Sequence, residues 1–67
     1  MRVTYEEKGD SVYIYLKDRI EAGEVVRTIA VSNFISLDFN SASQLVGVEV
    51  LGGSAIPAEL MELAEKL

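Results

Sequence analysis

A chain of 67 residues forms a single domain over residues 1–67, and a domain of this size buries only about 60% of the surface that its unfolded chain exposes, so it needs an additional source of stability. Cysteine and histidine are both absent, which excludes disulfides and the commonest protein ligands of a structural metal, and self-association is then the remaining aid. The 11 acidic and 6 basic residues give a net charge of −5 with the basic residues scattered, so we expect no direct binding of nucleic acid.

The N-terminal stretch alternates from its first residues and predicts a short strand over 2–5. It carries no long apolar run, so we expect neither a signal peptide nor a membrane span, and together with the lack of cysteine this favours a cytoplasmic protein. A charged turn comes next, over 6–10, in which Gly9 is the residue suited to a positive φ. Residues 11–16 alternate aliphatic and tyrosine side chains and predict a strand in the interior of the sheet.

The stretch 17–24 is polar and charged, which predicts a surface loop. The β-branched residues of 25–31 predict a third strand, and residues 32–33 form a tight connection to the next strand. The strongest pattern in the chain is over 34–51, where two alternating apolar runs flank a polar stretch too short for a parallel crossover. This stretch therefore predicts a β-hairpin around which the other strands are organised.

The hairpin has two different faces, because side chains alternate along each strand. The face expected to line the core carries Ile35, Leu37, Phe39, Val46, Val48 and Val50. The opposite, mixed face carries Phe34, Ser36, Asp38, Leu45, Gly47, Glu49 and Leu51. Something is expected to cover part of this mixed face.

The C-terminal stretch predicts an amphipathic helix over 57–66. Two glycines at 52–53 end the last strand, and Pro57 suits the first helical position because its missing N–H would have no helical partner. The apolar side is formed by Leu60, Leu63, Ala64 and Leu67, with Met61 at its edge, and the polar side by Glu59, Glu62, Glu65 and Lys66. Such a helix lies against a sheet face.

The predicted fold class is therefore α+β, in the order β-β-β-β-β-α, with a small antiparallel sheet of five strands and one C-terminal helix covering one face. A helix about 15 Å long cannot cover a sheet roughly 20 Å wide, so some apolar sheet surface stays open. We expect this surface to be closed by a homo-oligomer, a dimer or higher. The candidate interface residues are Tyr13, Tyr15, Phe34, Leu45, Gly47 and Leu51.

The strand region resembles the family called domain of unknown function 2283, small prokaryotic proteins that are mostly this one domain. The resemblance rests on Tyr5 before an acidic turn, on the aspartate, tyrosine and aliphatic pattern of 10–16, and on 37–39 leading to the run Leu-Val-Gly-Val-Glu-Val-Leu of 45–51. Two positions depart from the family pattern. Ser43 stands where a glycine is usual, at a cost of about 1 kcal/mol if the backbone there is left-handed, and Glu6 stands where an aspartate is usual. The resemblance implies a fold and a prokaryotic source but no established enzymatic activity.

Asp38 and Glu49 form the candidate polar site, because both carboxylates fall on the mixed face of the hairpin. They could act as an acid and base pair or as ligands of a hard cation. The competing interpretation is structural, with each carboxylate accepting hydrogen bonds from backbone groups or an arginine. Gly47 similarly marks the close approach of a ligand, a β-bulge, or a large side chain lying across it, from Phe34, Tyr13 or Tyr15.

The chain offers no catalytic residue that the sequence can identify. Its serines have no histidine to activate them, and the two glycines at 52–53 do not form a phosphate-binding loop. We therefore expect no catalytic or cofactor-binding residues, no cofactor and no metal, with a metal-dependent hydrolase using Asp38 and Glu49 as a distant third hypothesis.

The first functional hypothesis is a non-enzymatic, oligomeric interaction module. Its acidic charge suits binding of a small basic protein in an antidote-like role, with carboxylates such as Glu59, Glu62 and Glu65 steering association. The alternative is a small-ligand-binding domain whose pocket lies between protomers.

Overall fold

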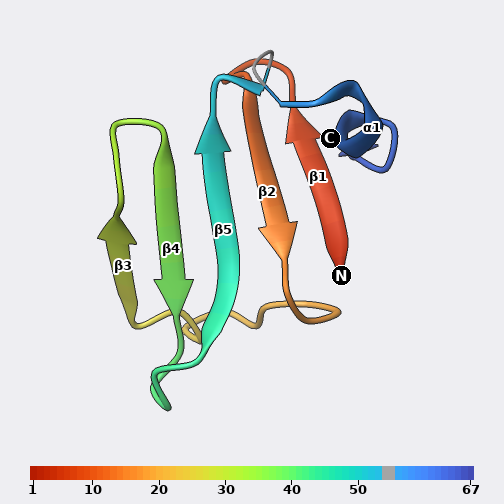
Figure 1. Ribbon diagram of the computed structural model, residues 1–67. Coiled ribbons are helices and arrows are strands. Elements are labelled where there is room, and N and C mark those ends of the chain that lie inside the picture. The colour runs from red at the N-terminus through yellow and green to blue at the C-terminus, as the bar shows by residue number, and fades with distance from the viewer. Residues whose placement is uncertain (54–55) are drawn as a thin grey trace.

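The computed structural model describes residues 1–53 and 56–67, which form a six-stranded sheet and one short helix (Figure 1). The elements, in chain order, are β1 (Arg2–Glu6), β2 (Ser11–Tyr15), β3 (Arg27–Ala30), β4 (Ile35–Phe39), β5 (Leu45–Leu51), α1 (Ala58–Met61) and β6 (Glu65–Lys66). The strand order across the sheet is β3-β4-β5-β2-β1-β6. Neighbouring strands are antiparallel except β1 and β6, which are parallel, so the sheet is mixed.

The strand β2 lies in the interior of the sheet, between β5 and β1, as its composition predicts. Its Val12 is fully buried and pairs with Tyr5 on β1 and Val50 on β5. In the described part of the chain the other buried apolar side chains are Val3 and Val46, so the core lies over β1, β2 and β5. The β3 end of the sheet is exposed along its whole length.

The hairpin of β4 and β5 has the predicted pairing at its open end, where Ile35 lies opposite Val50. A β-bulge between Asp38 and Phe39 then shifts the register, so that Phe39 lies opposite Leu45. The prediction that Leu45 shares a face with Gly47 is therefore wrong, because a bulge places an extra residue in one strand and alternation breaks there.

Two tight turns contain non-glycine residues with a positive φ. Ser43 has a φ of 61°, so the left-handed backbone that the family pattern implied at this position is present. At the first turn, the positive φ belongs to Asp10, at 49°, and not to the predicted Gly9. Asp10 closes that turn by donating its N–H to the carbonyl oxygen of Glu7, and aspartate tolerates this conformation better than most residues.

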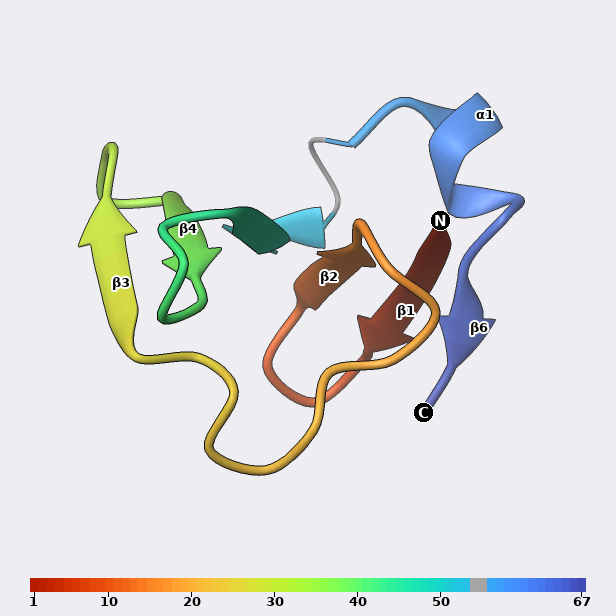
Figure 2. The same ribbon diagram turned by 90° about the horizontal axis from the view of Figure 1, so that it is seen from below.

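The C-terminal stretch differs most from its prediction. The helix α1 has four residues, ends at Met61, and lies beside β1 at the sheet edge instead of covering a face (Figures 1 and 2). Pro57 precedes it without a side-chain capping hydrogen bond, and so short a helix needs packing to persist. Residues 65–66 instead form β6 against β1, which satisfies backbone groups of an otherwise open edge and makes six strands where five were predicted.

Candidate functional site

The side chain of Tyr13 crosses β5 on the mixed face of the sheet. From β2 it passes over Gly47 and donates a hydrogen bond to Asp38 Oδ2 on β4 at 2.6 Å. A Cβ atom at Gly47 would lie only 2.8 Å from the ring carbon Cε2 of Tyr13 and closer still to its hydroxyl oxygen. This confirms the interpretation that a large side chain covers Gly47, and the side chain is Tyr13.

Asp38 holds two hydroxyl groups from strands on either side of it. Its Oδ2 accepts from Tyr13, and its Oδ1 accepts from Thr28 Oγ1 on β3 at 2.6 Å. Glu49 lies on the same face, opposite Ser36 on β4 and Tyr13 on β2. Both oxygens of Asp38 therefore have protein donors, an arrangement suited to joining strands.

The same line of contacts continues to the other edge of the sheet. The rings of Tyr13 and Tyr15 meet edge to face with centroids 4.7 Å apart, and Arg2 Cζ lies 4.5 Å above the centroid of Tyr15. Arg2 Nε then lies 3.4 Å from Glu65 Oε1 on β6. We call this line the transverse row, and its members are Thr28, Asp38, Tyr13, Tyr15, Arg2 and Glu65.

The hydroxyl of Tyr13 is held in its protonated form. Burial, followed by the hydrogen bond to Asp38 and the charge of that carboxylate, raises the pKa of Tyr13 well above its ordinary value of 10.0. A phenol with a raised pKa is a hydrogen-bond donor at neutral pH and a poor base or nucleophile. The Tyr13 hydroxyl therefore serves as the donor that joins β2 to Asp38 on β4.

The predicted interface residues separate into three places. Tyr13, Tyr15 and Gly47 lie in or under the transverse row. Phe34 and Leu51 are exposed neighbours at one end of the sheet, where the Leu51 N–H donates to the Phe34 carbonyl oxygen at 2.7 Å. Leu45 is exposed at the opposite end of β5.

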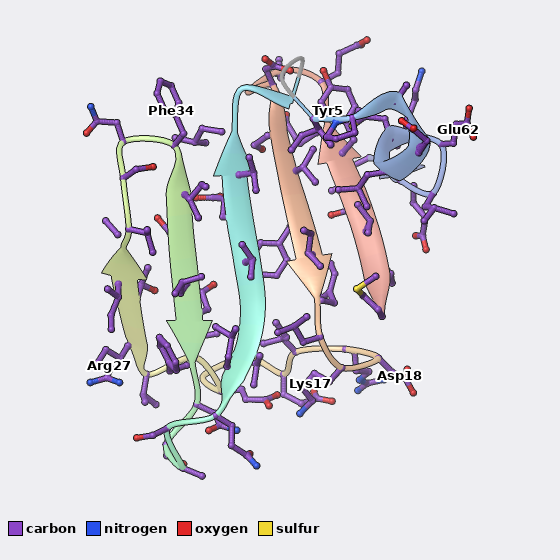
Figure 3. All side chains as sticks on the ribbon, in the orientation of Figure 1. Tyr5, Lys17, Asp18, Arg27, Phe34 and Glu62 are labelled. Atoms are coloured by element: carbon purple, nitrogen blue, oxygen red, sulfur yellow. The ribbon has the colours of Figure 1, made fainter. Side chains whose placement is uncertain are left out.

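Exposed apolar side chains gather instead around β3 and its connection to β4. Figure 3 shows Phe34 at the tip of this hairpin and Arg27 at the start of β3. Five large apolar side chains here are between 37% and 62% exposed, and we call them the hairpin cluster: Val26, Ile29, Val31, Phe34 and Ile35. Sequence reasoning included only Phe34 of these, because it expected the alternating face of Ile35 to be enclosed.

A second polar contact, outside the transverse row, joins β1 to the turn between β1 and β2. The Tyr5 hydroxyl donates to Asp10 Oδ1 at 2.9 Å, and this bond raises the pKa of Tyr5. The Asp10 carbonyl oxygen accepts the N–H groups of Gly52 and Gly53, each at 2.8 Å. A Cβ atom at Gly53 would lie 2.7 Å from the Tyr5 ring, so the glycine permits this approach. The sequence carried a signal for this contact only in the spacing of Tyr5 and Asp10 around a turn.

The described residues contain no group of three or more aspartate, glutamate, cysteine or histidine side chains placed to hold a metal ion. Within the same residues, no helix has the length and apolar character needed to traverse a bilayer.

The strand region matches the model of a protein family. The family is described as "Protein of unknown function (DUF2283)", and the match covers residues 2–54, which is most of the chain and includes β1 to β5. No curated protein and no solved structure matches the chain.

Proposed function

Since the chain belongs to the DUF2283 family, whose description states no activity, we propose from its own residues that it is a small, non-enzymatic interaction module that works as a homo-oligomer. The observation that carries this proposal is the hairpin cluster. Five large apolar side chains are exposed within a stretch of ten residues, on a domain whose buried apolar core, among the described residues, consists of three valines. Apolar surface gathered in this way is typical of a protein-binding site.

The polar face supports the non-enzymatic part of the proposal. The Tyr13 hydroxyl and both Asp38 oxygens already form hydrogen bonds with one another or with Thr28. A catalytic acid, base or metal ligand needs a group that is available to a substrate or an ion. The transverse row is therefore better suited to hold the sheet together than to act on a ligand.

Sedimentation equilibrium at micromolar concentration tests the proposal. We expect a dimer or higher oligomer, and we expect it to strengthen as salt rises, because each copy carries a net charge of −5 and salt screens the repulsion between copies. A single species of monomer mass over the whole salt range would contradict the proposal.

The acidic charge supports a second proposal, that the oligomer binds a small basic protein in an antidote-like role. Glu59 and Glu62 are exposed around α1, whereas Glu65 lies in β6 beside Arg2, so the three do not share one helix face as predicted. The double change Glu59→Gln with Glu62→Gln should slow association with such a partner, because charge steers encounter, and leave the stability of the fold unchanged. An association rate that is indifferent both to these changes and to salt would contradict this role.

A further inference from the structure

We propose that the β3 edge is the self-association site, and that two copies join edge to edge through antiparallel β3 strands into one continuous sheet. This inference rests on the proposed function, since it names the surface by which the module self-associates. Among the described residues, Figures 1 and 2 show nothing beyond β3 at its end of the sheet. All four residues of β3 are exposed.

The backbone of β3 has hydrogen-bonding groups that face outward. The Val31 N–H donates to the Ile35 carbonyl oxygen at 2.8 Å, so the backbone hydrogen-bonding groups of Val31 point toward β4. In an antiparallel ladder the residues that bond to a given neighbour alternate along the strand, so the N–H and C=O groups of Ile29 also point toward β4. The N–H and C=O groups of Thr28 and Ala30 consequently face away from the sheet, where another strand can pair with them.

The four-residue β3 edge also has few of the features that keep sheet edges apart. Exposed edges in monomeric proteins are blocked by lysine, proline, bulges or very short strands. Between Glu24 and Asp38 the only charged residue is Arg27, and that stretch contains no proline. The Arg27 guanidinium turns back over its own sheet, with Cζ 5.0 Å from the Phe39 ring centroid.

The opposite edge shows the contrast. There β6 has only two residues, Glu65 and Lys66, and both are charged and exposed. Glu65 also forms the ion pair with Arg2. One edge of the sheet is therefore protected against pairing, and the β3 edge is not.

The occupant that fits the β3 edge is a second copy of the same strand. If two β3 strands pair antiparallel about a two-fold axis at Ile29, Thr28 of each lies opposite Ala30 of the other, and these are the residues whose backbone groups face outward. Ile29 of one copy then lies opposite Ile29 of the other copy. The two Arg27 side chains fall at opposite ends of the pair, each opposite a Val31, so no like charges meet. The acidic residues lie outside this stretch of chain.

Cysteine cross-linking tests this register directly, because the chain has no cysteine of its own. Residues facing each other in a non-hydrogen-bonded antiparallel pair have Cα atoms about 4.5 Å apart, within the range that a disulfide spans. The variant Ile29→Cys should therefore oxidise to a covalent dimer in high yield. The matched control is Val31→Cys, which is also exposed but whose two copies would lie roughly 13 Å apart along the strands and should stay monomeric on a denaturing gel.

A second pair of variants separates this inference from the proposed function. Ala30→Pro removes an N–H that faces outward and should abolish the dimer in sedimentation equilibrium, whereas Ala30→Val keeps the N–H and should retain it. Circular dichroism establishes that both variants are folded. If Ala30→Pro does not fold, an Ala30 N-methylated by chemical synthesis makes the same test.

Each result decides between the possibilities. A wild-type oligomer that survives Ala30→Pro and does not cross-link through Ile29→Cys would overturn the edge pairing while the self-association proposal stands. A wild-type monomer would overturn both.

Discussion

At the scale of single residues, Gly47 and Tyr13 show how far sequence reasoning reaches. A glycine within a strand indicates a β-bulge or a group that passes close to the backbone, and the sequence left open a bulge, a ligand or one of three aromatic side chains. The choice among them depends on which strand lies beside β5. That neighbour is β2, more than 30 residues earlier in the chain, so the pairing could not be read from local pattern. Thr28, the second partner of Asp38, lies on the neighbouring strand β3, and it was missed because the cross-strand register of β3 and β4 was not worked out.

Replacing Gly47 with alanine should lower the free energy of unfolding by about 2 kcal/mol, because the added methyl group would occupy the space of the Tyr13 ring. Urea unfolding measures the change. In a Tyr13→Ala background the same replacement should cost much less, since the ring is then absent. An equal cost in both backgrounds would show that the contact with Tyr13 is not the cause.

Alkaline pH should unfold this protein through its tyrosines. The pKa values of Tyr13 and Tyr5 are raised in the folded state, so the folded protein keeps these protons when the unfolded chain has lost them. The stabilisation is thus fully present below pH 10 and is lost as pH rises above that value. We expect the free energy of unfolding to fall less steeply above pH 10 in Tyr13→Phe than in the wild type. If the free energy of unfolding fell equally steeply with pH in the two proteins, this prediction would be contradicted.

At the scale of elements, the strands were predicted well and the C-terminal helix was not. Alternation and β-branched residues identify strands through local side-chain patterns, and β1 to β5 begin or end within two residues of the predicted limits. The helical spacing over 57–66 predicts a helix packed against a face of the sheet. In the structure, residues 65–66 pair instead with the edge strand β1. This pairing depends on a strand at the other end of the chain, so the local pattern of 57–66 could not predict it.

The turn between β4 and β5 provides an element-scale prediction. Asn40 Oδ1 accepts the N–H groups of Ala42 and Gln44, and the turn requires a positive φ at Ser43. Ser43→Gly should raise the free energy of unfolding by about 1 kcal/mol, because glycine adopts this backbone without strain. The control is Ser41→Gly, in the same turn without a positive φ, which should give no gain in thermal or urea unfolding. A gain in both variants would point to a different cause.

The C-terminal strand β6 provides a second prediction at the scale of elements. The Leu67 N–H donates to the Tyr5 carbonyl oxygen at 2.9 Å, and the ion pair of Arg2 with Glu65 is exposed on both sides. Removing residues 65–67 should cost about 1–2 kcal/mol through lost backbone bonds, whereas Glu65→Gln should cost about 0.5 kcal/mol or less. Urea unfolding compares the two. A larger loss from Glu65→Gln would mean that charge, and not backbone pairing, holds β6.

At the scale of the whole molecule, composition predicted the class of the fold and missed where its surface lies open. The short chain, its 49% of hydrophobic residues, the lack of cysteine and the strand patterns together indicate a small α+β domain in need of a partner. The expectation was an uncovered central face, with Tyr13 and Tyr15 in the interface. The hairpin cluster lies instead at the β3 end, because strand order places β3 at the edge, and strand order depends on long-range pairing.

We expect the long connection from β2 to β3 to set the order in which this chain folds. The hairpin β1–β2 and the meander β3–β4–β5 each form from near neighbours in sequence, but they meet only when β2 pairs with β5. That step closes the 16–26 connection, and the entropy of closing it grows with its length. Inserting ten glycine and serine residues at Gly23, which has open space around it, should slow refolding about two- to threefold and leave the unfolding rate unchanged. Stopped-flow kinetics measures both rates. If the two halves joined only after the rate-limiting barrier, the insertion would instead speed unfolding and leave the refolding rate unchanged.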